Sequence, residues 1–358
     1  MILLDARSPA SGASGASDGA VSVATKKPGA MMALAIEGLD EYRRLRSEGP
    51  LGGIFHDRST FIVARTAAEQ AVLEQRSNIL AAAGVKASFL GGAEARLRIP
   101  ALTKETRIAL EIPDEGHVIG YDVVDKLIRA SCVKVLRDHP VTAMVPESDR
   151  RIRALRTPHG DLMADSVVIA AGLESNGLLG SPVLAPNKGQ VVITQRTGRK
   201  TDLYFDGHIL SAAYLESKGA SEVAAIDRPK IGTSIDPLKT GQVLIGGSRE
   251  GPGDPSANEF ETIKMILLSA IDLCPGLASH RILRAFAGLR ACSPDSLPLI
   301  GRHPSLENVW IATGFEGDGI CLGPLTGRMI ADLVLGGQPS ISIQPFDPGR
   351  FSVLKCAA

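Results

Sequence analysis

Three stretches of the chain carry residues whose types and spacing could do chemistry, and the first lies at the N-terminus. The apolar run Ile2–Leu4 ends on Asp5, and Arg7 and the small-residue stretch SPASGASGAS follow. In dinucleotide-binding folds an acidic residue at a strand tip binds a ribose hydroxyl. Glycine and serine let a backbone approach phosphate oxygens closely. Taken alone, however, this stretch of small residues favours a flexible N-terminal tail.

The second stretch is a strand followed by a glycine-punctuated turn and a helix. Residues 308–313, NVWIAT, read as a strand, and GFEGDGI follows at 314–320. We expect the next helix to begin near Pro324, because proline is favoured in a first helical turn. Bare amides at a helix start suit a ring that gains negative charge when it is reduced. The run SVVIAAG at 166–172 predicts a buried parallel strand that ends in a small-residue corner.

The third stretch is FAGLR, which ends on Arg290. A guanidinium group is planar, binds a carboxylate through two parallel hydrogen bonds and keeps its charge when desolvated. A surface arginine is the commoner case, but the apolar residues before Arg290 favour a buried position.

Composition excludes several classes of protein. The 358 residues carry 39 Lys+Arg and 39 Asp+Glu, so the charge balance does not favour nucleic acid or an anionic membrane as a partner. No apolar run reaches the ~20 residues of a membrane span, and the start lacks the features of a signal peptide. Five scattered cysteines without a CxxC pair predict reduced thiols in a cytoplasmic protein and no metal site. They are Cys132, Cys274, Cys292, Cys321 and Cys356.

These residues must be positioned by alternating helices and strands, which predict an α/β (α+β) protein. Helices are expected over 31–45, 66–84, 256–276 and 323–337. Capping boxes are expected at Thr66 with Glu69 and at Ser256 with Glu259. The strand-like runs are GQVVITQ, GQVLIGGS, SVVIAAG and NVWIATG. Near Cys132 a helical pattern gives way to VKVL, and no glycine or asparagine marks the helix end. Either the connection is unusually tight or a few residues are missing.

The stretches GLR…SPDSLPLIGR and GFEGDGICLGPLTGRMIADL resemble the FAD-dependent amine oxidoreductases of the D-amino-acid oxidase, glycine oxidase and sarcosine oxidase superfamily. GQVLIGGSREG and NKGQVVIT agree with the resemblance, which covers the whole chain. Within the superfamily, the chain looks most similar to flavin (β) subunits of hydroxyproline and proline dehydrogenases, opine oxidase and cyanide-forming glycine dehydrogenase. The resemblance implies non-covalent FAD, since Gly288 stands where sarcosine oxidases carry the flavin-linked cysteine. Cys292 is then expected to be a packed thiol.

The resemblance also implies a set of site residues. Arg290 would hold the substrate carboxylate, and Asp5 and Arg7 would lie at the adenosine ribose. The other implied FAD contacts are Ser11, Gly12, Ser14 and Gly15 along the pyrophosphate and ribityl chain, Val141 at adenine, Ala171 and Gly172 at the pyrophosphate, and Gly314, Gly317, Asp318, Gly319 and Ile320 at the flavin pyrimidine.

The domain organisation implied is interleaved. An FAD-binding Rossmann-like domain would take 1–50, 116–180 and 285–358, and an antiparallel-sheet substrate domain 51–115 and 181–284. The family's opening strand and its GxGxxG turn do not occur in the sequence. We therefore expect the chain expressed alone to bind FAD poorly or to be insoluble, and about 25–30 further residues to be encoded upstream of Met1.

Three functions remain open at this point. The first is FAD-dependent oxidation of the C–N bond of a small amino or imino acid by hydride transfer to flavin N5. Its partners would be the substrate and a second flavoprotein or iron–sulfur subunit, with no nucleic acid and no membrane span. The second is an inactive truncated remnant that acts as a binding or assembly partner. The third is a nicotinamide-dependent dehydrogenase, which only the acid at a strand tip favours. The substrate, the electron acceptor and the oligomeric state cannot be read from the sequence.

Overall fold

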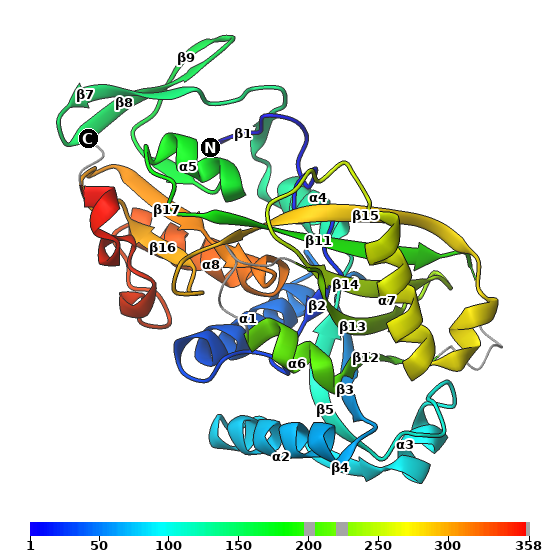
Figure 1. Cartoon of the computed structure of the whole chain (residues 1–358). Helices are drawn as coiled ribbons and strands as arrows, with labels where there is room; N and C mark the ends of the chain where they lie inside the picture. Colours follow the sequence, from blue (N-terminus) through cyan, green and yellow to red (C-terminus); the bar gives the residue numbers. More distant parts are fainter. Residues whose placement is uncertain (197–204, 220–227, 356–358) are drawn as a thin grey trace.

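The computed structural model of the chain describes residues 1–196, 205–219 and 228–355. Helices and sheets of both parallel and antiparallel pairing make up the molecule, which confirms the predicted mixed α/β fold class (Figure 1). Cys356, one of the predicted thiols, lies outside the described residues.

One curved ten-stranded sheet forms the centre of the molecule (Figure 1). It consists of β2 (Ala20–Val21), β3 (His56–Ala64), β4 (Ser88–Gly91), β5 (Ile108–His117), β11 (Ala185–Thr194), β12 (Gly207–Ser211), β13 (Lys230–Pro237), β14 (Val243–Arg249), β15 (Ile282–Cys292) and β18 (Phe315–Glu316). The order is β18-β15-β11-β14-β13-β12-β3-β5-β2, and β4 also pairs with β5. Neighbours are antiparallel except β12 and β3, which run parallel. The predicted strands GQVVITQ and GQVLIGGS are confirmed as parts of β11 and β14.

The parallel strands lie in two separate pieces. One piece pairs β1 (Ile2–Leu4) with β6 (Lys134–Leu136), and the other pairs β10 (Val167–Ile169) with β17 (Val309–Thr313). An antiparallel strand, β16 (Leu299–Arg302), completes the second piece. Within 1–196, 205–219 and 228–355, no strand bridges the two pieces.

The predicted burial of SVVIAAG is correct for only one face of the strand. Val167 and Ile169 are buried, but Val168 is 45% exposed. On the other parallel piece Ile2 is also half exposed, at 51%. Each piece therefore presents a large apolar side chain that no described element covers. An apolar run in the sequence does not show which of its side chains are left uncovered.

A third small sheet and the helices complete the fold. The small sheet is antiparallel and has the order β7-β8-β9. Its strands are β7 (Ala143–Ser148), β8 (Arg151–Thr157) and β9 (Gly160–Met163). The α-helices are α1 (Ala30–Ser47), α2 (Ala67–Ala82), α3 (Gly92–Arg98), α4 (Gly120–Ser131), α5 (Ser175–Leu178), α6 (Ala212–Gly219), α7 (Phe260–Leu273) and α8 (Gly319–Val334). Short 3-10 helices occupy Gly172–Glu174, Pro275–Ser279, Gln344–Phe346, Pro348–Arg350 and Ser352–Lys355.

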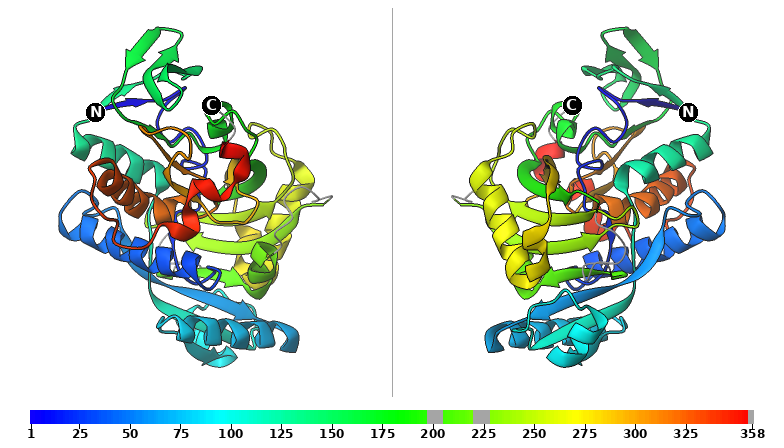
Figure 2. Two further views of the ribbon diagram at one scale, coloured as in Figure 1. Left: turned by 90° about the vertical axis from the view of Figure 1, so that its left-hand side faces the viewer. Right: turned by 90° about the vertical axis from the view of Figure 1, so that its right-hand side faces the viewer.

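The two largest of the four hydrophobic clusters lie around α8 and α7. Figures 1 and 2 show α7 and α8 on opposite sides of the molecule. The α8 core includes Leu34, Tyr42, Leu322 and Leu325, and the α7 core includes Phe61, Ile209, Ile245 and Ile266. Helices α1 and α8 cross closely, because a Cβ on Gly38 would lie 2.9 Å from the carbonyl oxygen of Cys321. The N-terminus of α8 is thus fixed against α1.

The sequence correctly predicts helices α1 and α2, and it predicts α7 and α8 with wrong N-terminal boundaries. Thr66 and Glu69 form the predicted capping box of α2. The predicted box at Ser256 is wrong, because α7 begins after Glu259 without a side-chain cap and Ser256 bonds Asp254 instead. The predicted start near Pro324 is also wrong, because α8 begins at Gly319.

A single residue, Cys132, makes the tight connection between α4 and β6 possible. Cys132 takes a left-handed conformation with φ of 52° at the end of the helix, and β6 begins at Lys134. A left-handed residue is the usual way to end a helix sharply, although glycine normally supplies it. Among the helices that the structure describes, none is long and apolar enough to cross a membrane.

Candidate functional site

The glycine turn after β17 lies beside the end of its parallel neighbour β10. The hydroxyl of Thr313 donates to the carbonyl oxygen of Gly172 at 2.9 Å, which ties the two strand ends together. Gly314 is buried with φ of 77°, and a Cβ there would lie 3.1 Å from Leu299. The turn therefore requires glycine on conformational grounds. The predicted residues Ala171 and Gly172 are exposed at the same corner.

The helix that follows this turn begins with an unusual cap. Asp318 is the N-cap residue of α8, yet its side chain makes no capping hydrogen bond. Its carboxylate instead pairs with Nζ of Lys26 at 2.6 Å, and both side chains are buried. Burial opposes the charge of Lys26, but Asp318 outweighs this effect and raises the pKa of Lys26 above its usual value. The ammonium group is therefore charged at neutral pH.

Arg290 lies on β15, where it contacts two neighbouring strands and the glycine turn. One terminal nitrogen donates to Oδ1 of Asn187 at 2.9 Å and to the carbonyl of Lys188 at 3.3 Å, and the other donates to the carbonyl of Ser248 at 3.2 Å. A Cβ on Gly189 would lie 2.4 Å from both terminal nitrogens. The guanidinium therefore lies directly over a glycine, and no other residue leaves that space.

The same guanidinium lies near the start of α8. A Cβ on Gly317 would lie 3.4 Å from Nε of Arg290. The side chain is half-buried, and burial and the charge of Arg249 lower its pKa. Since an arginine stays protonated at any physiological pH, the structure brings a fixed positive charge beside the predicted turn.

The small-residue stretch of the N-terminus forms a surface loop that packs against α4 and β15. A Cβ on Gly120 would lie 2.2 Å from the carbonyl oxygen of Ser14, and one on Gly288 would lie 2.8 Å from Cβ of Ala16. Both glycines are therefore needed for close packing. Ser11, Gly12 and Ser14 are exposed on this loop, which is ordered by its own turn bonds and is no free tail.

Asp5 and Arg7 lie at a second corner, where β1 meets the chain after β6. The carboxylate of Asp5 accepts the amide of Arg7 at 2.8 Å, and the amide of His139 donates to the carbonyl of Asp5 at 2.9 Å. Val141 follows two residues later and is half-buried. The predicted residues thus fall into two groups, one at β1 and β6 and one at β10, β17, α8 and β15, with the loop of Ser11 to Gly15 packed against α4 and β15.

Residues that the sequence did not single out complete the second group. Tyr214 of α6 is half-buried, and burial and the negative charge of Asp18 raise its pKa, while the charges of Arg249 and Arg290 oppose this. Lys26 and Asn187 were also missed. No local pattern marks any of the three, because Lys26 contacts a residue 292 positions away and Asn187 contacts one 103 positions away.

The cysteines near the site are buried and free. Cys292 is 2% exposed and Cys321 is 1% exposed, as expected for packed thiols. Burial first, and then the charge of Glu316, raises the pKa of Cys292 to about 12. In the part of the chain that the structure describes, no three His, Cys, Asp or Glu side chains group as a metal site would require.

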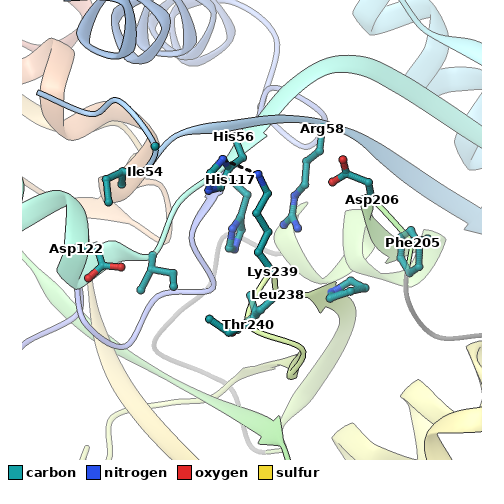
Figure 3. A pocket seen from close by; sticks show the side chains of 13 residues that line it. Ile54, His56, Arg58, His117, Asp122, Phe205, Asp206, Leu238, Lys239 and Thr240 are labelled. Carbon is teal, nitrogen blue, oxygen red and sulfur yellow. Dashed lines mark hydrogen bonds between the residues drawn. The ribbon is translucent and has the colours of Figure 1, made fainter. Parts of the chain in front are cut away.

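An open pocket lies apart from these residues (Figure 3). His56, Arg58, His117 and Lys239 line it, and none of the predicted site residues does. Its wall nevertheless reaches the N-terminal loop, because Nε2 of His117 lies 2.9 Å from the carbonyl oxygen of Asp18. A carbonyl only accepts, so this nitrogen carries the proton.

The residues present fit the expected FAD at two of its parts. The glycine turn, the start of α8 without a side-chain cap and the adjacent Arg290 suit a ring with carbonyl oxygens. The half-buried Asp5 suits a ribose hydroxyl. For the pyrophosphate, the described residues offer the exposed loop of Ser11 to Gly15 and the corner at Gly172. They hold no strand–turn–helix unit of the GxGxxG type between the two parallel pieces.

Comparison with known proteins identifies related sequences. The family DAO, described as FAD dependent oxidoreductase, matches residues 1–333. A glycine oxidase of Pseudomonas putida is 31% identical over 221 residues, which are 60% of this chain and 53% of that protein. The hydrogen cyanide synthase subunit HcnC of Pseudomonas aeruginosa is 28% identical over 273 residues, which are 74% of this chain and 60% of that protein. The chain thus spans less than two thirds of the length of these curated relatives.

Solved structures show the same fold. The crystal structure of glycine oxidase from Geobacillus kaustophilus aligns with a TM-score of 0.83 at 23% identity. The alignment covers 97% of this chain and 91% of that one. At this identity the likeness extends to the fold, which is the mixed arrangement of sheets described above.

Proposed function

The chain belongs to the DAO family of FAD-dependent oxidoreductases, and from that premise we propose that it oxidises the C–N bond of a small amino or imino acid. FAD would supply the chemistry by accepting a hydride at N5. The substrate would be of the hydroxyproline, proline, glycine, sarcosine or opine type. Glycine oxidase among the relatives supports this class.

The observation that carries the proposal is the position of Arg290. Its guanidinium is fixed by three hydrogen bonds that it donates to residues of β11 and β14, and the glycine turn before α8 lies next to it. A fixed guanidinium matches a carboxylate through two parallel hydrogen bonds. We assign Arg290 to the substrate carboxylate, with the reacting C–N bond held toward the glycine turn.

We also propose the remaining roles that the resemblance implies. Asp5, Arg7 and Val141 would contact the adenosine part of FAD, and the loop of Ser11 to Gly15 would contact its middle. Ala171 and Gly172 would flank the pyrophosphate, and residues 314–320 would contact the flavin ring. The FAD domain would comprise 1–50, 116–180 and 285–358, and the substrate domain 51–115 and 181–284.

A partner subunit is part of the proposal. One relative is named as a subunit of hydrogen cyanide synthase, which supports a heteromeric complex for this chain. We propose a second flavoprotein or an iron–sulfur subunit as the partner that takes up the electrons. Co-purification from the native host tests this, and full activity of an isolated monomer would count against it.

A second function is favoured by one specific observation. The parallel strands form two pieces that no described strand joins, and Ile2 and Val168 are half exposed on them. A chain with this arrangement could serve as an inactive binding or assembly partner. The discriminating measurement is flavin content together with turnover, since the inactive partner would show neither.

The experiment that tests the enzymatic proposal uses the full chain with added FAD and an artificial electron acceptor. Glycine, sarcosine, both proline enantiomers and hydroxyproline are supplied in turn. We expect turnover of at least one of them by the wild type. Removing one partner of a buried charged contact typically costs about 2–5 kcal/mol, so Arg290→Ala should raise KM by roughly one to three decades. Unchanged kinetics in Arg290→Ala would refute the assignment.

A further inference from the structure

We propose that Arg249 binds a second carboxylate group beside Arg290, so that the substrate is a small imino or amino acid with two carboxylates. The inference rests on the proposed function, since it selects a substrate class for the site of Arg290. Among the types proposed there, the opine type is the one that carries a carboxylate on both sides of its nitrogen.

The first observation is the face of the sheet from which the Arg249 side chain projects. Ile231 of β13 packs against the α7 core, and it pairs with Ser248 of β14. Residues directly opposite each other on two strands share a face, and successive side chains of one strand alternate between faces. Ser248 therefore faces α7, and Arg249 projects from the other face of the sheet.

Arg290 lies on this other face as well. Val192 of β11 belongs to the α7 core, so Gly189, an odd number of residues earlier, is on the opposite face. The guanidinium of Arg290 lies directly over Gly189, and it donates to the carbonyl oxygen of Ser248 at 3.2 Å. It thus extends from β15 across β11 as far as β14, on the face from which Arg249 projects.

The register of β11 and β14 brings the two arginines together. Lys188 and Glu250 form an antiparallel bridge, which places Gly189 opposite Arg249. Neighbouring strands lie about 4.8 Å apart. Because its guanidinium lies over Gly189, Arg290 carries its charge to within about one strand spacing of the Arg249 backbone.

The side chain of Arg249 has no partner in the described structure. It is half-buried, and within residues 1–196, 205–219 and 228–355 it forms no hydrogen bond or ion pair. Lys230, its direct cross-strand neighbour on β13, is a second cation without an acidic partner among these residues. Like charges directly opposite each other destabilise a sheet. An anion bound beside them would remove that cost.

The electrostatic effects agree with this arrangement. Burial, and then the charge of Arg249, lower the pKa of Arg290, and Asp18 opposes them less. The carboxylate of Asp18 accepts the amide of Ala20 at 3.2 Å and forms no ion pair with either arginine in the described part of the chain. The two guanidinium groups therefore repel each other, and a second negative group on the ligand would relieve the repulsion.

Two positive groups on one face match a ligand with two negative groups. A guanidinium binds a carboxylate through two parallel hydrogen bonds, and Arg249 has five N–H donors to offer. In the simplest imino dicarboxylic acid, a carbon–nitrogen–carbon link joins the two carboxylates and places the nitrogen between them. The reacting C–N bond is then held from both ends, whereas a substrate with one carboxylate is held from one end.

The test measures the binding of two unreactive carboxylates to the full chain by titration calorimetry, in the presence of excess FAD. Glutarate has the length of iminodiacetate but a CH2 group in place of the NH, and butyrate lacks the second carboxylate. We expect the wild type to bind glutarate at least roughly tenfold more tightly than butyrate, which corresponds to ~1.4 kcal/mol. Equal affinity for the two compounds in the wild type would overturn the inference.

Variants assign the preference to Arg249. Arg249→Gln should reduce the preference for glutarate roughly tenfold, whereas Arg290→Ala should weaken the binding of both compounds. Arg284→Gln is the matched control, because it removes the same charge at an exposed position of β15, about 20 Å along the strand from Arg290. The preference should persist in this control, and an equal loss in Arg284→Gln and Arg249→Gln would refute a specific role of Arg249.

A second variant keeps the inference testable if Arg249→Gln does not fold. Arg249→Lys retains the positive charge but not the planar fork. It should therefore still prefer glutarate, by a smaller factor than the wild type does. Complete loss of the preference in a folded Arg249→Lys would contradict attraction of a second carboxylate by this charge.

Turnover separates the inference from the proposed function. Iminodiacetate and sarcosine are supplied with an artificial electron acceptor, and Arg249→Gln should lower the ratio of their kcat/KM values roughly tenfold. If both compounds are oxidised and this ratio does not change, the proposed oxidation stands and the inference is overturned. If glutarate binding responds as expected but neither compound is oxidised, the second carboxylate site stands and the proposed oxidation is contradicted.

Discussion

The hydroxyl of Tyr42 donates to the carbonyl oxygen of Ile320 at 2.8 Å. In a regular helix that carbonyl would accept the amide four residues later, but Pro324 occupies this position and has no amide. Tyr42 of α1, which is fully buried, supplies the missing donor. The start of α8, where we place the flavin ring, is therefore fixed by a residue of another helix.

The first prediction follows from this bond. Tyr42→Phe should lower the free energy of unfolding by about 1–3 kcal/mol, because it leaves a buried carbonyl unpaired. Pro324→Ala restores an amide at the position that the carbonyl needs. In urea unfolding, Tyr42→Phe should therefore cost less in the Pro324→Ala background than in the wild type. Equal costs in both backgrounds would show that the bond does not compensate for the proline.

The second prediction concerns the space beneath Arg290. A Cβ on Gly189 would lie 2.4 Å from the guanidinium nitrogens, so Gly189→Ala should displace Arg290 without altering its charge. KM for the amino-acid substrate should rise roughly tenfold or more, given that ~1.4 kcal/mol corresponds to tenfold. Gly327→Ala is the control, because a Cβ there meets nothing within 4 Å. A KM for Gly189→Ala that matches this control would contradict the carboxylate role.

The third prediction contrasts the two predicted capping boxes. Thr66 accepts the amide of Glu69 at the start of α2, so Thr66→Ala should lower the free energy of unfolding by ~1 kcal/mol. Ser256 makes no capping bond to α7, and Ser256→Ala should cost clearly less. Chemical denaturation of both variants checks the pair. An equal loss at the two positions would mean that Ser256 caps α7 in solution.

The fourth prediction concerns pH. Burial first, and then the charge of Arg58, lowers the pKa of His117 to about 3 in the folded chain. Unfolded histidine has a pKa of ~6.5, so on acidification the unfolded state binds a proton that the folded state does not. Stability must therefore fall as the pH drops below that value.

His117→Gln measures this contribution, because glutamine donates to the carbonyl of Asp18 but does not titrate. Between about pH 7.5 and pH 5, the wild type should lose roughly 2 kcal/mol more than this variant. Parallel pH profiles of the two proteins would show that His117 is protonated in the folded state.

The sequence predicted those parts of the fold that depend on local signals. Thr66 and Glu69 are three positions apart, and the box they form is present. The same spacing at Ser256 and Glu259 forms no capping box. There the carboxylate of Glu259 accepts hydrogen bonds from Lys188 and Gln190 instead. Tertiary contacts of this kind leave no trace in a short window of sequence.

In the candidate site, too, local motifs could be predicted from the sequence and long-range contacts could not. The glycines of residues 314–320 stand out as a motif, and the structure brings one of them, Gly317, next to Arg290. Lys26 could not be found, because a lysine in ATKKPG reads as a solvated charge and its partner Asp318 is 292 residues away. The half-exposed Val168 also could not be foreseen, since the covering of one strand face depends on the neighbours present in the fold.

The most direct test of the account is anaerobic reduction of the chain loaded with excess FAD. A small amino or imino acid should bleach the absorbance of bound flavin in the wild type, and Arg290→Ala should need at least roughly tenfold more of it for the same bleaching. If the chain takes up no FAD at any concentration, if no substrate of this class bleaches the flavin, or if Arg290→Ala behaves as the wild type does, the proposed oxidation of a C–N bond at this site is contradicted.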